Sequence, residues 1–149
     1  MSDVNSMDTK VAGERPGRPV PVPSPLSAPF WRACVDGRLI YQRCVTCGTP
    51  VFPPQAFCPG QLHTDLEWED SSGEGTVYSY TIVGRPQTPA FETPYVVAVV
   101  ELSEGYTMMT NIVDCPPEEV HTGLRVSVKF VPLTPDISLP CFAPTVTST

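Results

Sequence analysis

Hydrophobic and polar positions alternate along the C-terminal half of the chain as they do in short β-strands. In LRVSVKFVPL, residues 124–133, apolar side chains fall on every second position, with Arg, Ser and Lys between them. The segments GTVYSYTIVG, YVVAVVEL and EGYTMMTNIV are rich in β-branched and aromatic residues, and turn residues separate them. This pattern predicts a small antiparallel barrel or sandwich over residues 75–144, and a closed barrel would leave no free sheet edge.

The N-terminal half begins with a different pattern. SAPFWRACVDG, residues 27–37, predicts a short helix that Ser27 can cap and Gly37 can end. Its aromatic residues Phe30 and Trp31 either pack on the rest of the fold or dock a partner, since aromatic side chains are favoured interface anchors. LIYQR then predicts a strand, which completes a helix-and-strand segment over residues 27–43.

The segment RCVTCGTPVFPPQAFCPGQLH, residues 43–63, has the form of a metal site with one ligand replaced. Cys44 and Cys47 form a C-x-x-C pair, and Cys58 stands on a second turn. Structural zinc needs four ligands, and the position that would complete a second pair is Gln61. His63 lies two residues further on, and imidazole binds zinc far better than a neutral amide does.

Three interpretations of this segment remain open. Zinc is held by three cysteines and His63, or the ribbon keeps its shape by packing without metal, or zinc takes another fourth ligand such as water or a partner's side chain. The module extends over residues 44–70, includes a strand in DLEWED, and gives way to the barrel near residues 71–75.

Proline is unusually frequent, at 19 of 149 residues against a usual ~5%. The prolines of RPGRPVPVPSPL favour an extended chain, so we expect residues 1–26 to be a disordered, proline-rich arm. The arm is either a solvated tail or a segment that lies along a partner subunit. Residues 145–149 form a short polar tail.

Charge and hydropathy narrow the classes of partner and location. The formal net charge is -7, whereas nucleic-acid-binding proteins are usually basic, so nucleic acid is not expected. No run approaches the ~20 apolar residues of a membrane span, and no membrane partner is expected. The N-terminus lacks the apolar core of a signal peptide, which predicts a cytoplasmic protein whose six cysteines bind metal or remain free thiols.

Catalytic chemistry has few candidate residues. The sequence contains two histidines, His63 and His121, and no Gly-rich phosphate loop or nucleophile motif. The loop GRPQTPAFETP, residues 84–94, lies between two predicted strands, where barrels of this kind often bind ligands. Within it Arg85 either contacts a phosphate or carboxylate or is a solubilising charge, and Phe91 either covers a ligand or plugs the barrel.

Several segments taken together resemble a known family. PFWRACVDGRLIYQRCVTCGTPVFPPQAFCP, GEGTVYSYTIV, PYVVAVVEL, GLRVSVKF and LPCFAP resemble small two-module proteins once catalogued as a domain of unknown function and associated with acyl-CoA metabolism. The resemblance covers about residues 26–144. It implies a mainly β fold with a short N-terminal helix, a rubredoxin-like zinc ribbon and a C-terminal OB-fold barrel.

The resemblance also implies a function. In the family that this chain resembles, several members are obligate small partners of thiolase-like enzymes, among them thiolases and steroid side-chain aldolases. It therefore implies a non-catalytic subunit of a hetero-oligomer that helps to hold an acyl-CoA thioester, with the reacting residues on the partner. It supports Cys44, Cys47 and Cys58 as zinc ligands, while the family's usual C-P-x-C is here interrupted by Gln61. The alternatives are a single-stranded nucleic-acid-binding OB-fold module and a stand-alone enzyme.

Overall fold

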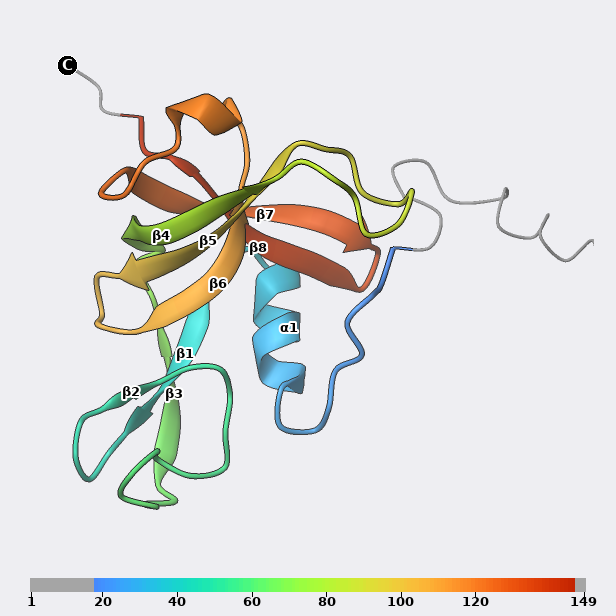
Figure 1. Ribbon diagram of the computed structural model, residues 1–149. Coiled ribbons are helices and arrows are strands. Elements are labelled where there is room, and N and C mark those ends of the chain that lie inside the picture. Colours follow the sequence, from blue (N-terminus) through green and yellow to red (C-terminus); the bar gives the residue numbers. More distant parts are fainter. Residues whose placement is uncertain (1–17, 147–149) are drawn as a thin grey trace, which may run out of the picture.

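The structure is a computed structural model that describes residues 18–146 (Figure 1). Most of the predicted disordered arm, residues 1–17, and the last residues of the predicted tail, 147–149, lie outside the described part of the chain. The described part of the arm runs from the β7–β8 end of the barrel to the start of the helix α1 (Figure 1).

The predicted helix is present as α1, Ala28–Val35. Gly37 ends it as expected: its φ is +78°, and its N–H donates to the carbonyl of Cys34 at 3.1 Å. The expected side-chain cap is wrong. Ser27 stands at the N-cap but has a helical backbone conformation, and its hydroxyl bonds Ser24 instead of a helix N–H.

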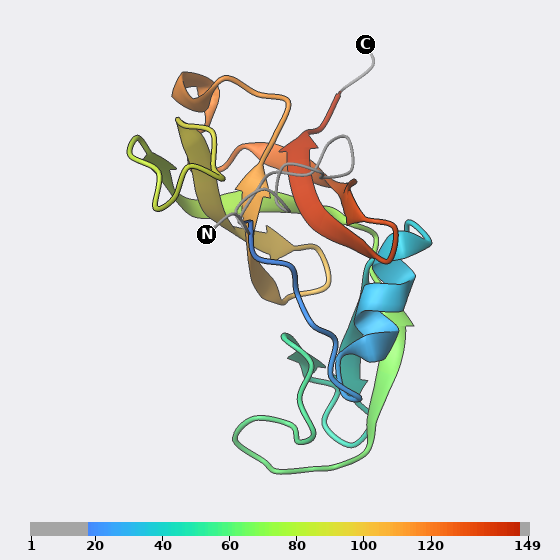
Figure 2. The ribbon, with the colours of Figure 1, turned by 90° about the vertical axis from the view of Figure 1, so that its right-hand side faces the viewer.

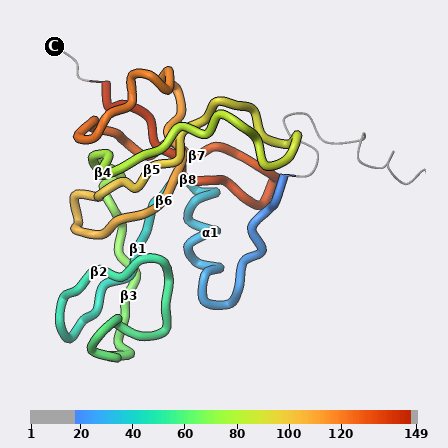
Figure 3. The backbone as a smooth tube through the Cα atoms, in the orientation of Figure 1, coloured from blue at the N-terminus to red at the C-terminus, as the bar shows by residue number. Residues whose placement is uncertain are grey.

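Below the barrel lies a small three-stranded antiparallel sheet in the order β2-β1-β3 (Figure 3). Its strands are β1 (Ile40–Cys44), β2 (Pro50–Val51) and β3 (Leu66–Asp70). The strands expected from LIYQR and DLEWED are confirmed, and they pair with each other along their whole length. The two-residue β2 is too short for a sequence pattern to reveal it.

The C-terminal half forms a closed barrel in the order β4-β5-β6-β8-β7, the OB-fold that the resemblance implies. Its strands are β4 (Glu74–Val83), β5 (Tyr95–Leu102), β6 (Thr107–Ile112), β7 (Arg125–Thr134) and β8 (Ile137–Pro144). A single 3-10 turn, η2 (Pro117–Glu119), lies between β6 and β7. The barrel closes through short contacts: β4 meets β7 at three residue pairs, and β6 meets β8 in parallel at one.

The alternation in β7 is confirmed, because Val126 is fully buried while Arg125 and Lys129 are exposed. The last strand, β8, is not predicted by the alternation of apolar and polar residues. Strand β8 contains LPCFAP, whose prolines are uncommon in strands, yet Pro140 pairs with Phe130 in the ladder of β7 and β8.

The ribbon sheet and the barrel share one hydrophobic core. Tyr41 of β1 stacks on Tyr106 of the barrel with ring centroids 4.8 Å apart, and Phe52 lies 5.3 Å from the same ring. Helix α1 contributes Phe30 and Cys34 to this core. Figure 2 shows α1 lying beside the strands that lead from the ribbon to the barrel. The ribbon is therefore anchored at one end, and its loops project away from the core.

Candidate functional site

The cysteine segment gathers four candidate metal ligands at the free end of the ribbon. The ligand atoms of Cys44, Cys47, Cys58 and His63 all lie within 4.8 Å of one another. The Sγ of Cys44 is 3.4 Å from Nδ1 of His63, and the Sγ of Cys47 is 3.5 Å from that of Cys58. The two loops thus bring His63 into the cluster.

Two tight turns create this arrangement. In the first, Gly48 has a φ of +76° and donates its N–H to the carbonyl of Cys44 at 2.8 Å. In the second, the N–H of Leu62 donates to the carbonyl of Cys58, and the N–H of Cys58 donates to that of His63, each at 2.8 Å. This pair of bonds folds residues 58–63 back on themselves. The histidine therefore meets the cluster, although its spacing from the cysteine is longer than that of a C-x-x-C turn.

These residues fit a structural zinc ion. Two ligand atoms on a tetrahedral zinc with bonds of about 2.0–2.3 Å stand about 3.3–3.8 Å apart, and both close pairs of the cluster have such separations. Three thiolates and one imidazole form a common zinc donor set. A bound zinc would cross-link the two loops, and Gln61 is exposed on the second of them.

The thiols of the cluster differ in acidity. The pKa of Cys47 is lowered to about 6, because the hydroxyl and backbone N–H of Thr49 donate hydrogen bonds to its sulfur. Burial raises the pKa of Cys58 to about 11. The pKa of Asp65 is lowered, chiefly by a hydrogen bond that the hydroxyl of Thr46 donates at 2.6 Å. Cys47 therefore ionises more readily than Cys58, and a metal cation is what would favour the Cys58 thiolate.

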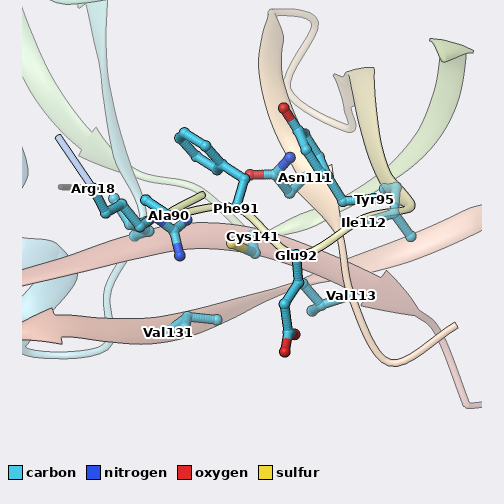
Figure 4. A pocket seen from close by; sticks show the side chains of 11 residues that line it. Arg18, Ala90, Phe91, Glu92, Tyr95, Asn111, Ile112, Val113, Val131 and Cys141 are labelled. Atoms are coloured by element: carbon cyan, nitrogen blue, oxygen red, sulfur yellow. The ribbon is translucent and has the colours of Figure 1, made fainter. Parts of the chain in front are cut away.

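A first cavity, of about 260 Å³, opens at the end of the barrel below the loop at residues 84–94 (Figure 4). Phe91, one of the two predicted ligand-binding residues, lines it and stacks on Tyr95 at 5.8 Å. The other, Arg85, is exposed and is not among the lining residues. The cation at this cavity is Arg18, whose guanidinium lies 5.6 Å from the centroid of the Phe91 ring.

Arg18 is the residue that sequence reasoning misses. It lies more than sixty positions before the loop, within a segment whose only pattern is its prolines. Glu92 also lines the cavity, so residues of both charge signs surround it. No local signal in the sequence relates the arm to the loop.

A second cavity, of about 440 Å³, lies between α1, the ribbon and strands β6 and β8. Its lining is mainly apolar and includes Trp31, Phe52 and Met109. The two cavities adjoin each other at strands β6 and β8, because both are lined by Asn111, Leu139 and Cys141.

The two aromatic residues predicted to bind a partner both line the second cavity, but they differ in burial. Phe30 is 5% exposed and packs edge-on against Trp31 and Phe52, at 5.2 and 5.5 Å. It is a core residue, as the packing alternative states. Trp31 is half-buried and lines the second cavity, so its role in binding a partner stays a prediction.

Outside the cluster, His121 is the remaining imidazole of the sequence. It lies exposed on a turn, with Nδ1 3.1 Å from the carbonyl oxygen of Thr122. A Cys/His catalytic pair would therefore have to use the ribbon cluster itself. Among the described residues, no helix has both the length and the hydropathy needed to cross a bilayer.

Two family models match the chain, in the order of its modules. The rubredoxin-like zinc ribbon domain of ChsH2 matches residues 31–60, and the C-terminal OB-fold domain of ChsH2 matches residues 68–131. The first match contains three residues of the cluster and the second contains most of the barrel. Together they reproduce the division of the fold.

Curated relatives agree with these matches. Over 94 residues the chain is 42% identical to a DUF35 domain-containing scaffold protein of Methanocaldococcus jannaschii, covering 62% of this chain and 67% of that protein. Over 129 residues it is 39% identical to the probable enoyl-CoA hydratase alpha subunit of Thermomonospora curvata. That alignment covers 87% of this chain and 40% of the relative, so the chain spans less than half of the relative's length.

A solved structure extends the agreement to three dimensions. The Ltp2–ChsH2(DUF35) aldolase contains a chain that superposes with a TM-score of 0.78 at 38% identity. The match covers 85% of this chain and 100% of that one. Sequence and fold thus point to the same set of relatives.

Proposed function

We propose a function from the premise that this chain belongs to the DUF35 family of zinc-ribbon and OB-fold proteins represented by ChsH2. In this proposal the chain is a non-catalytic subunit that docks on a thiolase- or aldolase-type enzyme. It also helps to hold the acyl-CoA thioester of that enzyme. Relatives named as a scaffold protein, as an alpha subunit and as part of an aldolase support a hetero-oligomer.

The observation that carries this proposal is an apolar surface on the outside of the barrel. In β5 the buried residues alternate with Tyr95, Val97 and Val99, which lie on the outward row and are only half-buried. Val99 pairs with Met109, which is 72% exposed and also lines the second cavity. A strand that is apolar on both faces usually has both faces covered. We define these four residues as the outer apolar row.

The acyl-CoA part of the proposal rests on the first cavity. A partner that covers the outer apolar row would lie beside this cavity, because Tyr95 belongs to both. Arg18 offers a guanidinium to an anionic group of the ligand, and Phe91 and Tyr95 offer apolar surface to its chain. Outside the ribbon cluster, the described serine–carboxylate pairs, Ser71 with Glu104 and Ser127 with Glu74, line neither of the two cavities, so we place the reacting groups on the partner.

The nucleic-acid alternative finds no support in the charges of the barrel. Residues 75–144 contain three cationic side chains, Arg85, Arg125 and Lys129, against seven carboxylates, Glu92, Glu101, Glu104, Asp114, Glu118, Glu119 and Asp136. Single-stranded nucleic acid needs a basic groove that follows its backbone. An excess of carboxylates repels such a ligand.

Docking can be tested by purifying the tagged full chain from its host and identifying the bound proteins by mass spectrometry. We expect a thiolase- or aldolase-type enzyme in stoichiometric amount, which Val99→Glu removes by placing a charge in the outer apolar row. Val146→Glu, at a position that is 90% exposed, is the matched control and should retain the enzyme. Retention by Val99→Glu would exclude this surface as the docking site.

Ligand binding needs a separate measurement on the purified complex. Titration calorimetry with an acyl-CoA thioester should show weaker binding for Arg18→Ala, by about tenfold if one charge-assisted contact of ~1.4 kcal/mol is lost. Arg85→Ala is the control, because Arg85 lies outside the cavity. Equal affinities for the wild type and Arg18→Ala would remove the arm from the site.

A further inference from the structure

Among the described strands, only β5 pairs with residues 79–83 of β4, so the second edge of this segment has no described strand beside it. Residues 79–83 pair with β5, whereas β4 meets β7 only at residues 74–76. The backbone of Val77 is bonded by the turn before β7: it donates to the carbonyl of Leu124 and accepts from the N–H of Gly123. From residue 78 onward, no strand in the described part of the chain pairs with the second edge of β4.

This edge is exposed on both faces of the strand. Tyr78 is 65%, Tyr80 39% and Ile82 44% exposed, and Ser79 and Thr81 between them are exposed as well. Tyr80 and Ile82 pair with buried residues of β5 and therefore stand on the row that faces the barrel interior. They remain exposed because β7 does not extend over them. The segment has unused backbone donors and acceptors together with uncovered apolar side chains.

Exposed edges of this kind are normally protected by charge, proline or a covering segment. The sequence YSYTIV, residues 78–83, has no charged residue and no proline, and it is composed mainly of aromatic and β-branched residues. Such an edge is suited to β-strand addition, in which a second extended segment continues the sheet.

The same sequence is complementary to itself. In an antiparallel pairing of two copies about a two-fold axis at Tyr80, Tyr80 faces its own counterpart and Ser79 faces Thr81 of the other copy. Tyr78, which stands at a register irregularity of β4 between Val77 and Ser79, then lies opposite Ile82. Aromatic, aromatic–aliphatic and hydroxyl pairs are favourable across antiparallel strands, by about 0.2–1 kcal/mol each, and no pair opposes like charges.

We propose that two copies of this chain associate through residues 78–82 of β4, forming a continuous antiparallel sheet across a two-fold axis at Tyr80. The interface is distinct from the outer apolar row and goes beyond the proposed function, because it needs no enzyme partner. A symmetric contact buries the same patch on both copies, which is the usual form of a soluble dimer.

Charge substitution on the axis gives the sharpest test. Tyr80→Lys and Tyr80→Glu each place like charges opposite each other, so each variant alone should weaken the dimer about tenfold or more in sedimentation velocity over a concentration series. An equimolar mixture of the two should restore a dimer that contains one copy of each. Only a contact with Tyr80 near the axis predicts this reciprocal rescue.

Two further variants serve as controls for this experiment. Met109→Lys, on β6 and away from the edge, should leave self-association unchanged while it abolishes copurification of the enzyme, so that the two proposals fail separately. Thr81→Lys, at an exposed position of the outward row, replaces Tyr80→Lys if the latter does not fold by circular dichroism. It should weaken the dimer as well.

Hydrogen exchange of the wild-type chain provides the structural readout, since amides in residues 78–82 should gain protection as the concentration rises. A wild-type chain that stays monomeric at every concentration overturns the proposal, and so does a dimer that survives both lysine variants. Protection of this edge only after addition of the enzyme also overturns it, because the added strand would then belong to the enzyme.

Discussion

The ribbon and the barrel are held together in different ways. Within residues 45–65 only Val51 and Cys58 are buried, and the chain there consists mostly of turns. The barrel buries at least one residue on each of its strands, among them Val77, Val100 and Phe142, and it buries every second residue of β5 and β6. A segment with so little apolar core needs cross-links, whereas a closed barrel is stabilised by its own packing.

This difference teaches how one short chain can carry two modules. Strand β1 anchors the ribbon in the shared core through Tyr41, and the ligand cluster at its far end takes the place of a second core. Loss of the cluster should therefore be a local event, and loss of the barrel a global one. Four experiments test this contrast, from the largest expected effect to the smallest.

Metal removal should have the largest effect and should stay local. Zinc binding in small modules contributes on the order of 10 kcal/mol to their folding. After treatment with a chelator, amide hydrogen exchange in residues 45–65 should approach the rate of an unfolded peptide, while Val96–Val100 of β5 stays protected. Elemental analysis before and after treatment should show about one zinc per chain and then none. Equal loss of protection in both modules would contradict the contrast.

Truncation of the barrel core should lower the stability of the whole chain. Phe142 is fully buried where β6, β7 and β8 meet, so Phe142→Ala is expected to cost about 3–5 kcal/mol. Denaturant unfolding followed by tryptophan fluorescence measures this. Phe142→Leu, which leaves a smaller cavity, serves as the control and should cost clearly less. Similar losses for the two variants would mean that the site collapses around the cavity.

Replacement of His63 tests which residue completes the cluster. If zinc binding contributes about 10–16 kcal/mol through four ligands, each ligand accounts for roughly 3 kcal/mol. His63→Ala should therefore lower the affinity for zinc by more than about a hundredfold. Competition with a chromogenic chelator measures the affinity. Gln61→Ala is the matched control and should bind zinc as the wild type does. The opposite ranking would make the amide the fourth ligand.

The smallest effect is expected at the junction of the two modules. Arg38 and Asp70 form an ion pair at 2.6 Å, but both side chains are more than half exposed, so Asp70→Asn should cost less than about 1 kcal/mol in denaturant unfolding. A larger loss would mean that the junction, and not the shared core, holds the ribbon against the barrel.

Much of the fold could be predicted from local patterns. Alternation identifies β7, the apolar run identifies β5, and the positive φ that a helix end requires identifies Gly37. The strand β8 could not be found in this way. Its prolines argue against a strand, and it forms because β7 supplies a complete ladder for LPCFAP.

The metal cluster and the first cavity likewise differ in how far they could be predicted from the sequence. The C-x-x-C turn and Cys58 are visible as a motif, because each turn depends on neighbours within a few residues. Arg85 is a reasonable cation for the loop by sequence, yet the cation that lines the cavity is Arg18, the first residue that the structure describes. The sequence gives no local signal that the N-terminal arm contacts this loop, because the two are far apart along the chain.

By itself, then, the sequence determined most of the strands, though not β2 or β8, together with the residue at which the helix stops and the residue types that could hold zinc, since these follow from side-chain chemistry and short-range backbone preference. The tertiary structure decided that His63 joins the cluster, that the arm rather than the loop brings a cation to the cavity, and that no described strand pairs with the second edge of β4 beyond residue 77. Each of these depends on how the chain reverses and closes over many residues, and only the packed core fixes that geometry.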